Sequence, residues 1–258
     1  MTVLITNDDG YKSWGINILY KAALEVFGDD VVVVAPEKMN SSAGMSFTFH
    51  KPLRVDRTEY EGMPCITISG KPADCTFMAL NHFFQGRIDL VLSGVNYGMN
   101  VGLSPIYSSG TVSAALYAAI SKVPSVAFSK HLINTKSQDA IKKEMENIFP
   151  GVVKLLARIK SKPFPHGIEL LNINFPKTIN EDTPIKVVKA DRKVFQDIVQ
   201  ERVDPVNRPY YWLYGTLKKD FDPTADVANL LNGNITITPI KLYASDKMEL
   251  SSVREMFV

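Results

Sequence analysis

The sequence has few of the features that mark secreted, membrane-spanning or nucleic-acid-binding proteins. Only two of its 258 residues are cysteines, which is too few for a disulfide framework or a cysteine-rich zinc site. Its four histidines are scattered, and none has the spacing of a metal-ligand motif. No apolar run approaches the roughly 20 residues that span a bilayer, and the formal net charge is only +2. We therefore expect a cytoplasmic protein without a secretory signal that binds neither nucleic acid nor membranes.

The features that are present indicate an α/β protein. Residues 2–6, 31–36 and 88–93 are short apolar runs, which are typical of strands buried on both faces of a parallel sheet. Residues 15–27 and 139–159 carry apolar side chains at a spacing of three to four and predict helices. The alternation of such segments predicts a mostly parallel sheet with crossover helices.

Two less regular segments and the C-terminal third complete the predicted organisation. Residues 47–55 predict a short strand, and the glycine- and asparagine-rich residues 94–110 predict a loop. Beyond about residue 178, the pattern changes to short β-like runs with an aromatic cluster. We expect one domain, with a core over residues 1–178. Residues 179–258 would form a β-rich arm, a last strand and a C-terminal helix that take part in oligomerisation.

Polar side chains gather where the predicted strands end. Asp8 and Asp9 follow the first strand, Ser41 follows the second, Asn96 follows the strand at 88–93, and Ser109 opens the next predicted helix. Ligands bind to parallel α/β sheets in the crevice beyond the carboxyl ends of the strands. We therefore expect these residues to meet at one edge of the sheet, although about a hundred residues of sequence separate them.

The residue types in this group point to phosphate chemistry. Two adjacent carboxylates repel each other, so Asp8 and Asp9 call for a cation or for strong hydrogen bonding. Carboxylates with a hydroxyl and an amide oxygen form the ligand set that Mg²⁺ or Mn²⁺ prefers. Free N–H groups at the start of the helix near Ser109 favour an anion. A cation beside an anion site predicts attack of metal-activated water on phosphorus.

Each of these stretches also fits a purely structural role. Asp8 suits a turn between strand and helix, Ser41 solvates a loop, and Asn96 near glycines is typical of a turn. The sequence SGT before a helix is first of all a capping signal. The aromatic residues 210–214 favour a core or subunit-contact strand over a base-stacking surface. Only the joint placement at one sheet edge favours the catalytic interpretation.

Five sequence blocks together match a known family. They are ITNDDG, VVAP followed by Ser41, GKPADC, SGVNYG and SGTVSAALYAAI. In this order they resemble the SurE family of survival-protein phosphatases over nearly the whole chain. The resemblance implies a Rossmann-like fold with a swapped C-terminal arm, and cytoplasmic homodimers or tetramers. It also implies metal-dependent hydrolysis of 5′- or 3′-nucleoside monophosphates, with polyphosphate as a side substrate of some members.

The resemblance assigns roles residue by residue. The implied ligands of one Mg²⁺ or Mn²⁺ per subunit are Asp8, Asp9, Ser41 and Asn96. The implied catalytic residues are Asp8, Asp9 and Asn96. The implied substrate-binding residues are Gly44, Asn96, Ser109, Gly110 and Thr111. Because the segment before this helix is one residue longer than is usual in the family, whether Ser108 or Ser109 faces the phosphate is left open.

Two alternatives use the same residues in other ways. In a phosphoaspartyl mechanism, Asp8 or Asp9 attacks the phosphorus directly. In a nucleotide-binding regulatory module, the crevice binds its ligand without turnover. Carboxylates repel a phosphate unless a cation intervenes, which disfavours the second alternative. No serine–histidine or cysteine–histidine partnership is apparent in the sequence, so we expect water to be the nucleophile.

Overall fold

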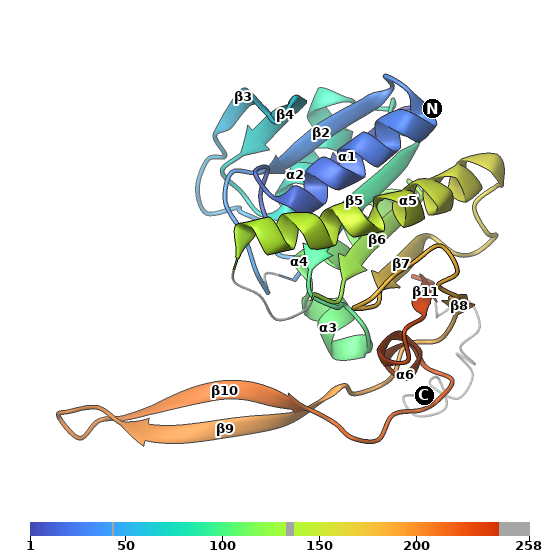
Figure 1. Cartoon of the computed structure of the whole chain (residues 1–258). Coiled ribbons are helices and arrows are strands. Elements are labelled where there is room, and N and C mark those ends of the chain that lie inside the picture. Colours follow the sequence, from blue (N-terminus) through green and yellow to red (C-terminus); the bar gives the residue numbers. More distant parts are fainter. Residues whose placement is uncertain (43, 133–136, 243–258) are drawn as a thin grey trace, which may run out of the picture.

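A nine-stranded sheet forms the centre of the molecule in the computed structural model, which describes residues 1–42, 44–132 and 137–242 (Figure 1). The strand order is β3-β4-β2-β1-β5-β6-β7-β11-β8. The strands from β4 to β7 in this order are parallel, whereas β3 and β11 pair antiparallel at its two sides. The strands are β1 (Val3–Thr6), β2 (Val31–Pro36), β3 (Val55–Tyr60), β4 (Met63–Ile68), β5 (Leu90–Tyr97), β6 (Ser125–Lys130), β7 (Leu170–Phe175), β8 (Ile185–Val187) and β11 (Ile235–Ile240).

Helices cover both faces of this sheet, as expected for parallel strands that are apolar on both sides. Helices α1 and α5 pack on one face through side chains such as Leu19 and Met145, and α2 and α4 pack on the other through Cys75 and Ala118. The helices are α1 (Trp14–Phe27), α2 (Pro72–Met78) with a following π-helical turn (Ala79–Phe83), α3 (Leu103–Ser108), α4 (Gly110–Ile120), α5 (Gln138–Ser161) and α6 (Asp226–Leu231). Within the described ranges, none of them is long and apolar enough to cross a membrane.

The chain after residue 178 contributes to two separate structures. Strands β8 and β11 extend the main sheet beyond β7. Strands β9 (Phe195–Val203) and β10 (Pro209–Leu217) pair antiparallel into a two-stranded hairpin, which we call the arm and which projects away from the sheet (Figure 1). Every residue of β10 is exposed. The C-terminal helix expected after the last strand falls on residues 243–258, which lie outside the described residues.

Two expectations from the sequence are corrected by the fold. The strand expected at residues 47–55 is absent up to Val55, where β3 begins. The Thr48 N–H and hydroxyl instead donate to the two carboxylate oxygens of Asp74, at 3.0 and 2.7 Å, which anchors this segment to α2. The loop expected at residues 94–110 is also wrong in part, because β5 continues to Tyr97 and α3 forms within the segment.

Candidate active site

Four chain segments that are distant in sequence line one cavity of about 360 Å³ at an edge of the sheet. Asp8 follows β1, Ser41 follows β2, Asn96 lies near the end of β5, and Ser109 precedes α4. Strands β1, β2 and β5 are parallel neighbours, so their carboxyl ends lie at the same edge. The structure therefore brings four of the predicted residues to one cavity, namely Asp8, Ser41, Asn96 and Ser109, whereas Asp9 does not line it.

The turn after β1 is held by its own side chains. The Asn7 side-chain amide donates to the Gly10 carbonyl at 3.0 Å and to the Ser13 hydroxyl oxygen at 2.8 Å. Ser13 is in turn the N-cap of α1. These bonds join the strand to the helix and fix the turn that carries Asp8, which lines the cavity, and Asp9 beside it.

Asp8 is 6% exposed and contacts two other parts of the site. Its carboxylate accepts a short hydrogen bond from the Thr111 hydroxyl, and its carbonyl accepts the Asn40 N–H at 2.8 Å. The second bond holds the loop that carries Ser41. A side chain at Gly110 would place its Cβ only 2.7 Å from the Asp8 Cβ, so the close approach of α4 requires glycine.

Asp9 and Asn96 are linked through the end of β5. The Asp9 carboxylate accepts the Tyr97 N–H at 3.2 Å, and the Tyr97 hydroxyl accepts the Gly15 N–H at 3.2 Å. The side-chain nitrogen of Asn96 donates to the Gly98 carbonyl at 2.9 Å. This bond orients the amide, so that its oxygen, the atom suited to bind a cation, lies on the opposite side.

The electrostatics of the site favour a cation. Burial raises the pKa of Asp8, against the effect of the Thr111 hydroxyl, which lowers it. Burial, and then the charge of Asp8, raise the pKa of Asp9 to about 7. Among the described residues that line the cavity, none is a lysine or arginine. Asp8, which is buried and lines the cavity, and the adjacent half-buried Asp9 therefore lie beside a cavity with no lysine or arginine, and a bound cation would relieve their repulsion.

The donor set fits a hard divalent cation. Asp8 and Asp9 contribute carboxylates, Ser41 a hydroxyl and Asn96 an amide oxygen, all of which suit Mg²⁺ or Mn²⁺. Across the described part of the chain, no three His, Cys, Asp or Glu side chains come close enough to hold a metal by themselves. A cation bound at this edge would therefore need other oxygen ligands beside the two carboxylates, and the serine and the asparagine are the predicted ones.

The start of α4 and its approach form the opposite wall of the cavity. Ser108 and Ser109 both line it, but in different ways. Ser109 is the N-cap of α4, and its hydroxyl oxygen accepts the Val112 N–H at 3.2 Å. Ser108 donates its hydroxyl hydrogen back to the Ser104 carbonyl within α3, at 2.9 Å. In the first turn of α4, the Val112 N–H is used by the Ser109 cap, and the Thr111 N–H interacts with the Asp8 carboxylate and lowers its pKa. The start of a helix is also a position that suits an anion.

Four predicted site residues are not among the residues that line the cavity: Asp9, Gly44, Gly110 and Thr111. Asp9 and Gly110 directly follow lining residues in the sequence and Thr111 comes next after Gly110, whereas Gly44 has a structural contact of its own. Its N–H donates to the Ser108 carbonyl at 3.0 Å, which ties the loop after β2 to the end of α3. In this arrangement, the Gly44 N–H holds the cavity wall together and is not a free donor.

Comparisons with known proteins agree on one family. The family model described as survival protein SurE matches residues 3–197. This chain belongs to the SurE family. The 5′-nucleotidase SurE of Methanosarcina mazei is 36% identical over 97% of this chain and 96% of the relative, and that of Pyrobaculum arsenaticum is 40% identical over 94% and 90%. The crystal structure of the SurE protein from Aquifex aeolicus has a TM-score of 0.81 and 32% identity, and the match covers 99% of this chain and 100% of that one.

Several residues that line the cavity of this SurE chain were not predicted as site residues from the sequence, among them Asn100, Tyr97 and Phe195. Asn100 is held by β6 and β7, since its N–H donates to the Asn174 side chain at 2.8 Å and its side chain to the Ser129 hydroxyl at 2.9 Å. A second asparagine shortly after Asn96 was a readable signal. Tyr97 carried no signal, because its contribution is mainly a backbone N–H. Phe195 carried none either, since it enters the cavity from the root of the arm.

Proposed function

We propose that the chain hydrolyses nucleoside monophosphates to a nucleoside and phosphate, with one bound Mg²⁺ or Mn²⁺. Membership of the SurE family supports the class of enzyme, a phosphoric monoester hydrolase, since curated relatives carry the name 5′-nucleotidase. The single observation that carries the proposal is the cavity shared by Asp8, Ser41 and Asn96 at the carboxyl ends of three parallel strands.

The residues of the two cavity walls have separate tasks in this proposal. A divalent cation at the four predicted ligands would polarise a phosphoryl oxygen and acidify a water molecule. Asp8 contacts the first turn of α4, and its carboxylate would orient the attacking water. Thr111 keeps the Asp8 carboxylate in place through its hydroxyl. The N–H groups at the start of α4 stabilise negative charge on the phosphoryl oxygens.

A substrate screen tests the proposal. Phosphate release is measured for 5′- and 3′-nucleoside monophosphates and for polyphosphate, with Mg²⁺, with Mn²⁺ and with excess chelator. We expect release from at least one nucleoside monophosphate, its loss in chelator and its recovery when the cation is restored. Full activity in chelator would exclude the role of the cation. Tight nucleotide binding without release would favour the binding module over the enzyme.

A single turnover in ¹⁸O-labelled water, together with trapping by a phosphate mimic, separates direct hydrolysis from a phosphoaspartyl enzyme. Direct attack by water places the label in the released phosphate alone and forms no covalent enzyme. Attack by Asp8 or Asp9 forms a covalent enzyme that a phosphate mimic traps. Its hydrolysis at the carboxyl carbon places label in the enzyme, and its hydrolysis at phosphorus places label in the phosphate. We expect label only in the phosphate and no trapped carboxylate, because Asp8 and Asp9 are predicted cation ligands.

We also propose that a second copy of the chain covers the arm, giving a homodimer or tetramer. Trp212 is 57% exposed and Leu213 is 78% exposed on a hairpin that has no other strand beside it among the described residues. Such an exposed apolar ribbon is marginally stable alone and typical of an interface. Deleting residues 193–220 should lower the molecular mass in solution, measured by light scattering, and so should the pair W212S and L213S. An unchanged mass would contradict the proposal, and E201S is the matched control.

We place the activity in the cytoplasm. Cys65 and Cys75 are free and buried, and burial raises the pKa of the Cys65 thiol to about 12. Unpaired, unreactive thiols suit a reducing compartment. Fractionation of cells that produce the tagged chain should recover it with cytoplasmic markers.

A further inference from the structure

Residues 191–195, which lead into β9 and which we call the root of the arm, lie against the wall of the cavity within the same subunit. The Leu103 N–H donates to the Asp191 carbonyl at 2.8 Å. A side chain at Gly102 would place its Cβ 2.1 Å from a methyl carbon of Val194, so the two segments are in close contact. Phe195, the first residue of β9, itself lines the cavity. The arm therefore begins as part of the active-site wall.

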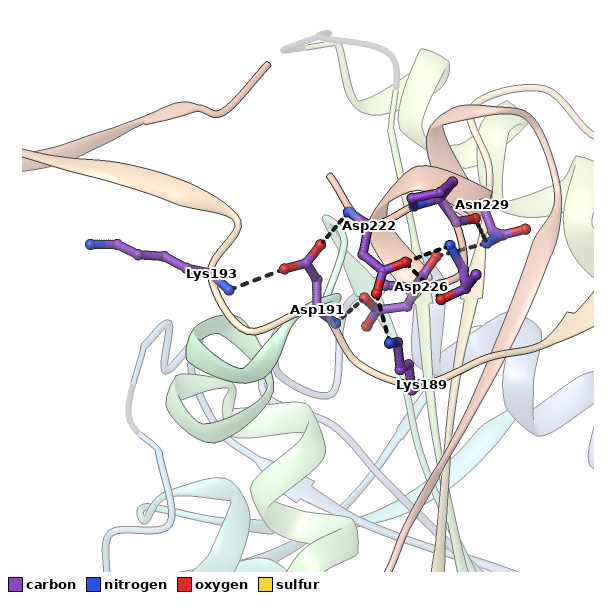
Figure 2. Close-up of polar contacts among 9 residues, drawn as sticks. Lys189, Asp191, Lys193, Asp222, Asp226 and Asn229 are labelled. Atoms are coloured by element: carbon purple, nitrogen blue, oxygen red, sulfur yellow. Dashed lines mark hydrogen bonds and ion pairs between the residues drawn. The ribbon is translucent and has the colours of Figure 1, made fainter. Parts of the chain in front are cut away.

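One buried carboxylate joins the two segments. Asp226, at the start of α6, is fully buried, and its carboxylate accepts three backbone N–H groups. One oxygen accepts the Gly102 N–H at 2.7 Å, and the other accepts the Asp191 N–H at 2.8 Å and the Val227 N–H at 2.8 Å. Figure 2 shows Asp226 beside Asp191 at the point where the chain leaves the body for the arm.

Further bonds give the arm root a defined shape. The Asp191 carboxylate accepts the Lys193 N–H at 3.3 Å and the Asp222 N–H at 3.2 Å, so it joins the chain entering the arm to the chain leaving it (Figure 2). Around Asp226, an apolar cluster includes Val101, Val194, Val227 and Leu230. The segment on the cavity side is thus fixed by both a charge-assisted hydrogen bond and packing.

The segment that Asp226 holds leads directly to the start of α4, where we propose that the phosphate binds. Asn100 and Ser104 flank Gly102 and line the cavity. Helix α3 starts at Leu103, and the residue that follows its last turn is Ser109, the N-cap of α4. A six-residue helix has no room to absorb a displacement at its start, so a shift at Gly102 would move the start of α4.

We propose that Asp226 is a positioning residue, which holds residues 99–109 of the cavity wall on the root of the arm. Its kinetic consequence rests on the proposed phosphatase function, whereas its structural consequence does not. The root of the arm and the cavity wall at residues 99–109 would then move together. A partner subunit that grips the arm would, through Asp226, also set the geometry of the active site.

The test compares Asp226→Asn with Asp222→Asn. The asparagine keeps the shape of Asp226 but turns an NH₂ group toward one of the backbone donors, which loses that hydrogen bond. Asp222 belongs to the same network, pairs with Lys189 at 2.6 Å and has an exposed side chain, so it is the matched control. Amide hydrogen exchange of residues 99–109 is measured without cation or substrate, and kcat and KM are measured for adenosine monophosphate with Mn²⁺.

We expect D226N to speed exchange at residues 99–109 by about tenfold and to lower kcat/KM by about tenfold, with D222N within about twofold of wild type. Exchange that rises equally throughout the protein, or kinetics equal to those of D222N, would overturn the proposal. If D226N does not fold, V194A replaces it, since it trims the contact with Gly102. Unchanged exchange at residues 99–109 in that variant would then overturn the proposal. A wild-type enzyme without turnover would contradict the proposed function, while the exchange result still decides the role of Asp226.

Discussion

Asp8 and Asp226 are both buried carboxylates, one on each side of the same cavity wall, but they are satisfied in different ways. Three backbone N–H groups surround Asp226 and offset part of the effect of burial, which raises its pKa. Asp8 has the Thr111 hydroxyl and the backbone N–H groups of Asp8 and Thr111, which lower its pKa against burial. Each has an acidic neighbour, but the Asp191 carboxylate beside Asp226 accepts two backbone N–H groups, whereas the Asp9 carboxylate beside Asp8 accepts one.

The difference separates a structural carboxylate from a ligand. A buried carboxylate that accepts enough hydrogen bonds from the protein needs no bound ion, and those bonds hold chain segments together. A pair of buried carboxylates that repel each other is complete only when something positive joins them. The two sides of the cavity should therefore respond in opposite ways to the removal of a carboxylate and to the addition of a cation.

The largest expected effect comes from removing the carboxylate of Asp8. Asp8→Asn should lower phosphatase activity by at least about a hundredfold, because it removes a cation ligand and the group that orients water. The variant should stay folded, since the asparagine relieves the repulsion with Asp9. Circular dichroism checks the fold, and D56N, at an exposed position on β3, should keep full activity. Substantial activity in D8N would contradict the assignment.

Cation binding is the next largest effect. Mn²⁺ at a hundred times its Kd should stabilise the wild type by about 2.7 kcal/mol, which raises the Tm by roughly 5 to 10 °C for a chain of this size. The double variant D8N/D9N should show no such shift. An equal shift in wild type and double variant would place the cation elsewhere. D226N, if folded, should keep most of the shift, because its carboxylate is not a ligand.

Asp9 provides a pH test on the metal-free protein. The pKa of Asp9 is about 7 in the folded chain, above its ordinary value of 3.8. Between these values the folded state holds a proton that the unfolded state has released, so stability falls as the pH rises through this window. Relative to D9N, the free energy of unfolding of the wild type should fall by at most about 1.4 kcal/mol per pH unit.

Denaturant unfolding in chelator, at several pH values across that window, measures the difference between the two proteins. The comparison with D9N cancels the titrating groups that do not interact with Asp9, so the difference reports on Asp9 and its neighbour Asp8. A difference that is constant with pH would show that Asp9 ionises normally. Saturating Mn²⁺ should reverse the trend, because the cation binds the ionised carboxylates.

The cation side of the cavity could be predicted from sequence because the position of each residue there depends only on the strand that it follows. Parallel strands have their carboxyl ends at the same edge of a sheet, so the polar residues that follow β1, β2 and β5 were expected to meet there. Asp8 and Asn96 needed no knowledge of side-chain contacts to be placed together. The parallel order and the covering helices followed from the same alternation of segments.

The arm side could not be predicted because its contacts span the chain. Helix α3 forms in a segment rich in glycine and asparagine, and the bond that holds its start comes from Asp226, 124 residues away from Gly102. Phe195 reaches the cavity only because the arm root packs on that segment. Local composition indicated a loop, and tertiary hydrogen bonds and packing made the wall.

The smallest expected effect locates the boundary between the cation side and the arm side of the cavity. We place this boundary between Ser108 and Ser109. Ser109 caps α4, which packs on Asp8, whereas Ser108 ends α3, which the arm root holds. Ser109→Ala should cost about 1 kcal/mol of stability, measured by denaturant unfolding, and should raise the KM, because the cap and the anion wall share one side chain. Ser108→Ala should change both quantities less, since its exposed hydroxyl only bonds back to the Ser104 carbonyl. If S108A raised the KM more than S109A, the phosphate would lie on the arm side of the boundary. The boundary inferred from the comparison of Asp8 with Asp226 would then be wrong.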